Sequence, residues 1–179
     1  MEDNELVNKC QQEETKNQAF AILVDRYQKK VYWLVRKMVI DHDEADDLTQ
    51  DIFVKVWKNL SGFKGDSKLF TWIYRIAVNE CLNHLSNKRK RFFIPMVDVE
   101  KEMSRKIDSG LHISGDEIQI KLQKAILTLP EKQRLVFNMK YFEEMKYEEI
   151  AEVLGTSVGA LKASYHHAVK KIEDYMSRN

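Results

Sequence analysis

The chain has 179 residues, of which 44% are hydrophobic and 32% are charged, and its formal net charge is +1. This balance excludes a disordered chain and an integral membrane protein, and by itself it points to no class of partner. Only six residues are Gly and two are Pro, which argues against a turn-rich β-sandwich or a glycine-rich nucleotide loop. The composition predicts an all-α protein with few joints, built as one ordinary domain or two small ones.

The sequence shows no feature of secretion or of a metal site. Its first ten residues are polar and acidic, unlike a signal peptide, and its longest purely apolar run, 19–24, is too short to span a membrane. Cys10 and Cys81 lie far apart and predict neither a disulfide framework nor a zinc site. We therefore expect a cytoplasmic protein with no membrane insertion of its own and no cofactor.

Helical periodicity predicts three helices in the first half of the chain. The first carries an apolar stripe over 20–38, the second spans about 43–60, and the third spans about 67–91. The third helix is apolar on nearly all sides between Leu69 and Leu82, as expected of a central core helix.

The pattern stops over 92–115, where a proline and two glycines occur among mixed charges. A loop of this length is uncommon inside one compact domain, so we interpret 92–115 as a linker. It would join a domain at 1–91 to a domain at 116–179. The second domain is predicted to contain four helices, at about 118–129, 130–142, 147–154 and 157–176.

The end of the chain follows the plan of a helix-turn-helix: a short acidic helix, a Gly-containing turn and a second helix. Between Ser157 and Lys171 there are three lysines and no acid. Small and polar residues gather opposite the apolar side of this helix, which suits the DNA major groove. A helical hairpin with a solvated face is the alternative. His166 and His167 are adjacent and point about 100° apart, so they do not suit one metal ion.

Acidic residues are concentrated at the start of the second predicted helix, where 41–51 holds six acids and no base. The helix dipole favours acids there, but six exceed what capping needs. We therefore expect a basic protein partner.

Three ordered blocks then carry a likeness to a known family. They are DEADDLTQDIFVKVW, FKGDSKLFTWIYRIAVNECLNHL and a C-terminal set, LPEKQRLVF, YEEIAEVLG and SVGALKASYHHAVKKI. Together they resemble bacterial RNA polymerase sigma factors, most closely the extracytoplasmic-function (ECF) subfamily, over nearly the whole chain. The first two blocks are similar to sigma region two and the last set to region four. The resemblance implies two small helical domains on a flexible linker, which direct promoter-specific transcription initiation without enzymatic activity.

The resemblance also implies contacts with promoter DNA. Region two of the family captures a flipped base of the −10 element with a loop that here is Phe63, Lys64, Gly65, Asp66, Ser67 and Lys68, with Asn79 facing it. Further contacts would come from Arg75, Asn83, Lys88 and Arg89, and the basic run 88–91 suits phosphates, although the helix dipole alone also favours it. The −35 element would be met by Lys162, Ala163, Ser164, His166, His167 and Lys170.

Protein partners follow from the same resemblance. The implied contacts with core RNA polymerase, at the β′ clamp helices, are Asp46, Asp47, Gln50, Asp51 and Phe53. Region four would meet the β flap, and an anti-sigma factor is a further expected partner. Trp57 would join the polymerase contact or pack in the core, and we expect core packing for Trp72 and Tyr74.

The sequence departs from the family at several positions. Ala163, Ser164 and His167 stand where the family usually has Arg or Lys, which predicts weaker or different DNA contacts. Lys146 stands where the family often has a Ser or Thr cap, which predicts a less firm helix start.

Three alternatives remain open at this point. An autonomous helix-turn-helix regulator would leave the acidic helix and the 63–68 loop without a role. A helical metal-dependent hydrolase would need paired His and carboxylate motifs on facing helices, and the five His form none. A pure adaptor would leave the basic helix end unexplained.

Overall fold

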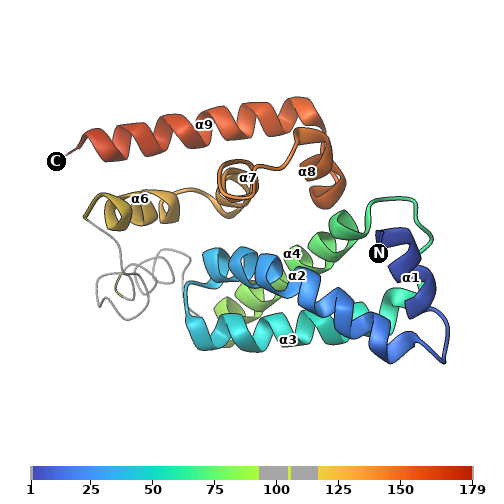
Figure 1. Ribbon diagram of the computed structural model, residues 1–179. Coiled ribbons are helices and arrows are strands. Elements are labelled where there is room, and N and C mark those ends of the chain that lie inside the picture. The colour runs from blue at the N-terminus through green and yellow to red at the C-terminus, as the bar shows by residue number, and fades with distance from the viewer. Residues whose placement is uncertain (1, 93–104, 106–116, 179) are drawn as a thin grey trace.

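The computed structural model describes residues 2–92, 105 and 117–178, so the predicted linker lies almost wholly outside the described residues. Every element in these ranges is helical, as the composition and periodicity predict. In chain order they are α1 Asp3–Cys10, α2 Lys16–Val39, α3 His42–Asn59, the 3-10 turn η1 Leu60–Gly62, α4 Leu69–Phe92, α6 Glu117–Leu127, α7 Glu131–Tyr141, α8 Tyr147–Leu154 and α9 Val158–Ser177 (Figure 1).

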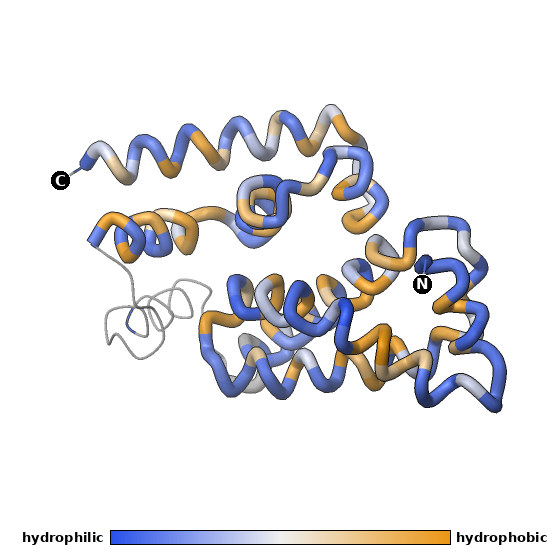
Figure 2. The backbone as a smooth tube through the Cα atoms, viewed as in Figure 1, coloured by the Kyte–Doolittle hydropathy of each residue, from blue (hydrophilic) through white to orange (hydrophobic). Residues whose placement is uncertain are grey.

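The N-terminal half, α1–α4, is a bundle in which α2, α3 and α4 pack pairwise against one another. The apolar stripe of α2 is buried, as its spacing predicts, and the centre of the core is formed by Leu23, Leu34, Ile52 and Ile73. Burial of each such side chain stabilises the fold by about 1.5–3 kcal/mol. Figure 2 shows hydrophobic and hydrophilic residues alternating along the helices, as amphipathic helices require.

The junction between α2 and α3 is tight. Ile40 ends α2 in the left-handed region, at φ 65°, where its N–H still bonds the carbonyl of Arg36. Asp41 then caps α3, because its Oδ1 accepts from the N–H of Glu44 at 3.1 Å. This turn sends the acidic start of α3 back along α2.

Helix α1 was not predicted, because its polar sequence has too few apolar residues to show a period. Its buried side chains are Leu6, Val7 and Cys10. It is fixed to α2 by the carboxylate of Asp3, which accepts hydrogen bonds from Arg26 and Tyr27 at 2.6 Å each. Packing onto a neighbour, rather than a pattern of its own, makes this segment helical.

The C-terminal half, α6–α9, encloses a second core. It contains Ala125, Ile126, Leu129, Phe137, Ala168 and Ile172. Gly155 ends α8 in the left-handed conformation, at φ 62°, and Ser157 caps α9 by accepting from the N–H of Ala160 at 3.2 Å. These two residues build the turn of the predicted helix-turn-helix.

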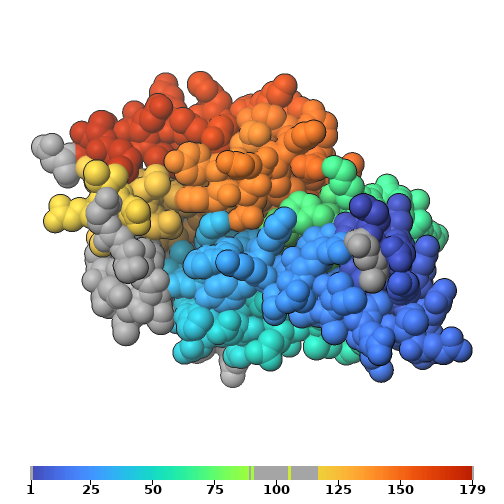
Figure 3. Space-filling view, viewed as in Figure 1, coloured from blue at the N-terminus to red at the C-terminus, as the bar shows by residue number. Residues whose placement is uncertain are grey.

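The two halves lie in contact. α8 packs against α4 and α7 against α2, and Met145, Ile150 and Val153 belong to the same buried cluster as the core of the N-terminal half. Figure 3 shows the surfaces of the two halves meeting over α2 and the start of α4. No helix in the described part of the chain combines the length and hydrophobicity needed to cross a membrane.

Candidate DNA and polymerase interfaces

The predicted base-capture loop, 63–68, joins η1 to α4. Phe63 begins it as an anchor: its ring packs on Trp72 with the centroids 5.1 Å apart, and its carbonyl accepts from Nε2 of Gln11 at 3.1 Å. Lys64, Gly65 and Asp66 are exposed, and Gly65 has φ 80°, a conformation that favours glycine. The loop is therefore fixed at its first residue and open to solvent at its centre.

One face of α4 continues from this loop. Arg75, Asn79 and Asn83 are spaced by four residues and are all exposed, so they form one polar row. Within the described residues no hydrogen bond joins Asn79 to the 63–68 loop. The structure therefore places Asn79 on this polar row and shows no contact between its amide and the loop. Arg75 is engaged, because its guanidinium donates to the carbonyl oxygen of Glu152 at 2.9 Å.

The basic end of α4 is partly neutralised. Nζ of Lys88 lies 2.6 Å from Oε1 of Glu44 on α3, and Nε2 of His84 lies 3.6 Å from Oε2 of the same carboxylate. Lys90 is exposed, whereas the side chains of Arg89 and Arg91 fall outside the described residues. The structure thus gives Lys88 a partner inside the protein, which the sequence did not predict.

The acidic helix α8 lies over the 63–68 loop. Nζ of Lys68 is 2.8 Å from Oε1 of Glu149, and this contact lowers the pKa of Glu149 and raises that of Lys68. Oε2 of Glu149 also accepts from the N–H of Lys146 at 3.1 Å, so the start of α8 is capped from Glu149 although Lys146 is no capping residue. A cavity of about 690 Å³ between loop and helix is lined by Asn4, Gly65, Asp66, Ser67, Lys68, Lys146, Glu148, Glu149 and Glu152.

The outer face of α9 has the polarity that the helical pattern predicts. Leu161, Ala168 and Ile172 face the core and are buried. Of the predicted DNA contacts Ser164 is half-buried, and the exposed ones are Lys162, Ala163, His166, His167 and Lys170. Such a face, which combines a short side chain with two histidines and two lysines, can enter a major groove and reach a phosphate.

The acidic helix α3 borders an apolar groove against α2. The groove holds about 500 Å³ and is lined by Asn17, Phe20, Ala21, Gln50, Phe53, Val54 and Trp57. Phe20 and Trp57 meet edge to face at 4.8 Å, and Lys16 lies over the Trp57 ring at 4.5 Å. Trp57 is thus half-buried in the groove wall. This position is compatible with both of its predicted roles, packing in the core and contact with polymerase.

The predicted polymerase contacts differ in exposure. Phe53 lines the groove but is only 7% exposed. The other four are exposed: Asp46, Asp47, Gln50 and Asp51. They make the surface beside the groove strongly acidic.

Trp72 and Tyr74 of α4, for which core packing is predicted, both lie against the core. Tyr74 is fully buried, which confirms its predicted core role, and burial together with the charge of Glu143 raises its pKa. Trp72 is half-buried against Phe63.

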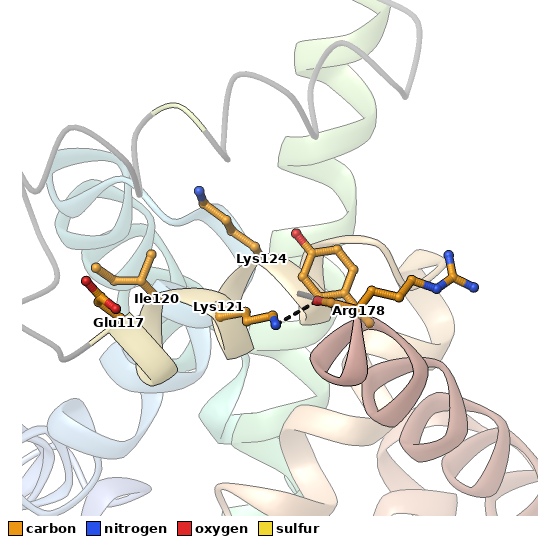
Figure 4. Close-up of a pocket in the computed structure, with 6 residues that line it drawn as sticks. Glu117, Ile120, Lys121, Lys124 and Arg178 are labelled. Carbon is orange, nitrogen blue, oxygen red and sulfur yellow. Dashed lines mark hydrogen bonds between the residues drawn. The ribbon is translucent and has the colours of Figure 1, made fainter.

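A further pocket lies between α6 and α9, where Nζ of Lys121 donates to the carbonyl oxygens of Met176 and Arg178 at 2.8 and 2.7 Å (Figure 4). Lysine at these last carbonyls caps the end of α9, which gives the pocket a structural role.

Comparison with known proteins follows the same division of the chain. Residues 23–91 match Sigma-70 region 2, and residues 119–172 match Sigma-70, region 4. The chain is 32% identical to the RNA polymerase sigma-H factor of Pseudomonas aeruginosa, over 96% of this chain and 92% of that one. It is also 32% identical to the ECF RNA polymerase sigma-E factor of Escherichia coli K12, over 96% and 93%. Among solved structures, the sigma factor RpoE in complex with the anti-sigma factor NepR from Bartonella quintana has the same fold, with a TM-score of 0.69 at 20% identity, over 89% of this chain and 98% of that one.

Proposed function

The chain belongs to the ECF family of RNA polymerase sigma factors, and from this membership we propose how its surfaces share the work of initiation. As a sigma factor it binds core RNA polymerase, directs promoter-specific transcription initiation and is not itself an enzyme. What remains to be assigned is which residues perform each step.

The N-terminal domain, 1–91, reads the −10 element in this proposal. The carrying observation is the polar row of Arg75, Asn79 and Asn83, which starts beside an exposed glycine-containing loop. A base leaving the stack can enter the loop and present its Watson–Crick edge to backbone groups and to an asparagine amide. Capture of an extruded base offsets the cost of unstacking and unpairing it, which is a few kcal/mol per base.

The C-terminal domain, 116–179, reads the −35 element as duplex DNA through the outer face of α9. His166 and His167 reach base edges, and Lys162 and Lys170 contact phosphates. Residues 92–115 serve as the connection that lets the two readers occupy separate elements.

Core polymerase binds along α3. The exposed carboxylates of Asp46, Asp47 and Asp51 steer a basic partner, and the adjacent groove takes an apolar side chain of that partner. We assign this surface to the β′ clamp helices and the C-terminal domain to the β flap. The chain acts in the cytoplasm, where polymerase and DNA are found.

An anti-sigma factor is the third proposed partner. The support is the Bartonella quintana sigma factor, which is complexed with the anti-sigma factor NepR. A partner of this kind would have to cover the DNA-reading or polymerase-binding surfaces described above.

Reconstitution tests the assignment. Core RNA polymerase freed of sigma is mixed with the protein and a randomised promoter library, and the transcripts are sequenced. We expect initiation from templates that share two spaced elements, and none from core polymerase alone. Absence of initiation, together with tight duplex binding by the protein alone, would instead identify an autonomous helix-turn-helix regulator.

A further inference from the structure

A side chain from outside the 63–68 loop holds the start of that loop. Nε2 of Gln11, directly after α1, donates to the carbonyl of Leu60 at 3.2 Å and to the carbonyl of Phe63 at 3.1 Å. An amide nitrogen carries two hydrogens, so both donors of Gln11 are used on these carbonyls. The two bonds reach across 49 and 52 positions of the chain. They tie α1 to the segment that enters the loop.

The residue held in this way is the first of the loop. The N–H of Phe63 donates to the carbonyl of Leu60 at 3.2 Å and closes η1, and the Phe63 backbone is extended. The Phe63 ring packs on Trp72, and the Phe63 carbonyl bonds Gln11. The direction in which the chain leaves η1 is therefore fixed at the ring and at the carbonyl of one residue.

The backbone that carries the Gln11 side chain is itself fixed. Helix α1 lies beside η1 and the start of α4 (Figure 1), and three of its side chains are buried. Asp3 accepts from Arg26 and Tyr27 of α2 at 2.6 Å each. At the other end of α1 the N–H of Gln11 bonds the carbonyl of Val7 at 3.1 Å. The amide of Gln11 is thus presented to the loop from a segment anchored at both ends.

The rest of the loop supplies little order of its own. Gly65 at its centre is exposed and has φ 80°. At the far end Lys68 pairs with Glu149, but the Lys68 side chain is 70% exposed, and ion pairs at such exposure contribute little stability. The end held by Gln11 therefore determines how well the loop is ordered before DNA arrives.

We propose that Gln11 is a positioning residue for base capture by the 63–68 loop. Gln11 acts through the backbone of Phe63 and does not itself meet DNA. A site that is ordered in advance loses less conformational entropy when its ligand binds, so the two hydrogen bonds strengthen capture of the extruded base. This inference rests on the proposed function, in which the loop takes a flipped base of the −10 element.

Removal of the two donors tests the proposal. Gln11→Met keeps the length of the side chain and has neither charge nor donor, and Gln12→Met makes the same change at the exposed neighbour. Holoenzymes of the full-length variants bind single-stranded oligonucleotides of a promoter selected from the library, with the captured base present or abasic. We expect Gln11→Met to bind the intact strand about tenfold more weakly, as loss of ordinary hydrogen bonds implies, and the abasic strand unchanged. Gln12→Met should bind both strands normally.

A donor at the same position should restore binding. Gln11→Lys keeps hydrogen-bond donors on a long side chain, and Gln12→Lys controls for the added charge. We expect these two variants to bind the intact strand equally well. Equal losses of Gln11→Met on the intact and abasic strands, or a matching loss of affinity for core polymerase, would give Gln11 a merely structural role and overturn the proposal.

Hydrogen exchange of the free full-length protein separates this inference from the proposed function. The amides of residues 61–66 should exchange about fivefold faster in Gln11→Met than in Gln12→Met, because a weakened anchor lets the segment open more often. The amides of α9 should not change. Unchanged exchange over 61–66 would overturn the inference. If the unsubstituted holoenzyme binds intact and abasic strands equally well, the base-capture role proposed for the loop is refuted, whatever the exchange rates are.

Discussion

Nζ of Lys88, close to the end of α4, lies 2.6 Å from Oε1 of Glu44 in the first turn of α3, and the two side chains are only 19% and 27% exposed. The family resemblance places Lys88 at DNA and α3 at polymerase. One ion pair therefore links the two proposed interfaces. A substitution of Lys88 or of Glu44 should affect both of them.

Replacement of Lys88 by Met should lower the free energy of unfolding by about 1 kcal/mol, because the partly buried ion pair with Glu44 is lost. Lys90→Met is the control, since Lys90 is exposed, and it should leave stability unchanged. Urea unfolding followed by circular dichroism measures both. Equal stability of the two variants would show that the ion pair contributes nothing in solution.

Asn79→Ala should abolish or strongly reduce promoter opening and leave binding to core polymerase intact, because in the proposed assignment the amide meets only the extruded base. Asn59→Ala provides a matched control, as that exposed amide bonds only the carbonyl of Lys55 in its own helix. Permanganate footprinting measures opening, and native gel shifts measure core binding. Loss of core binding in Asn79→Ala would refute its assignment to the base pocket.

Lys170→Gln should weaken duplex binding to similar degrees across sequences and reduce the steepness of the salt dependence by about 0.9 in log–log slope, as expected for one lost phosphate contact. The neighbouring Lys171 donates to Oε1 of Gln133 at 3.2 Å, so Lys171→Gln should change the slope less. Titration of fluorescent −35 duplexes at several salt concentrations measures the effect. A change of sequence preference in Lys170→Gln would mean that this lysine contacts bases.

Val54→Asp should reduce affinity for core polymerase at least tenfold, because it places a charge at the wall of an apolar groove on an already acidic surface. Val54 is 49% exposed, so little stability should be lost. Ile22→Asp is the control, because Ile22 is 40% exposed on α2 and does not line the groove. Competition with a labelled sigma factor for core polymerase gives the affinities. If both variants bind equally well, the groove is not part of the interface.

Local pattern accounts for most of the helices. The stripe of α2, the outer face of α9 and the turn at Gly155 and Ser157 follow from spacing and capping chemistry that are legible in the sequence. The short helix α1 could not be predicted in this way, since it becomes helical only by burying Leu6, Val7 and Cys10 against its neighbours.

The ion-pair partners of charged residues could not be predicted from the sequence either. Lys88 meets Glu44 across 44 positions, and Lys68 meets Glu149 across 81. No local rule links residues so distant, and each charge taken alone also fits a solvated face. The family resemblance therefore located candidate DNA contacts, but only the fold shows which of them already hold an internal partner.

The amide of Gln11, at the end of α1, donates to the carbonyls of both Leu60 and Phe63, at 3.2 and 3.1 Å. These two carbonyls lie at the start of η1 and directly after it, and η1 leads into the 63–68 loop. Yet the match to Sigma-70 region 2 begins only at residue 23. A fragment that begins at residue 23 would keep every residue assigned to the −10 element. It would lose the Gln11 hydrogen bonds that hold the start of the 63–68 loop in place. A fragment of this protein that is meant to read the −10 element therefore has to include the helix that the family boundary leaves out.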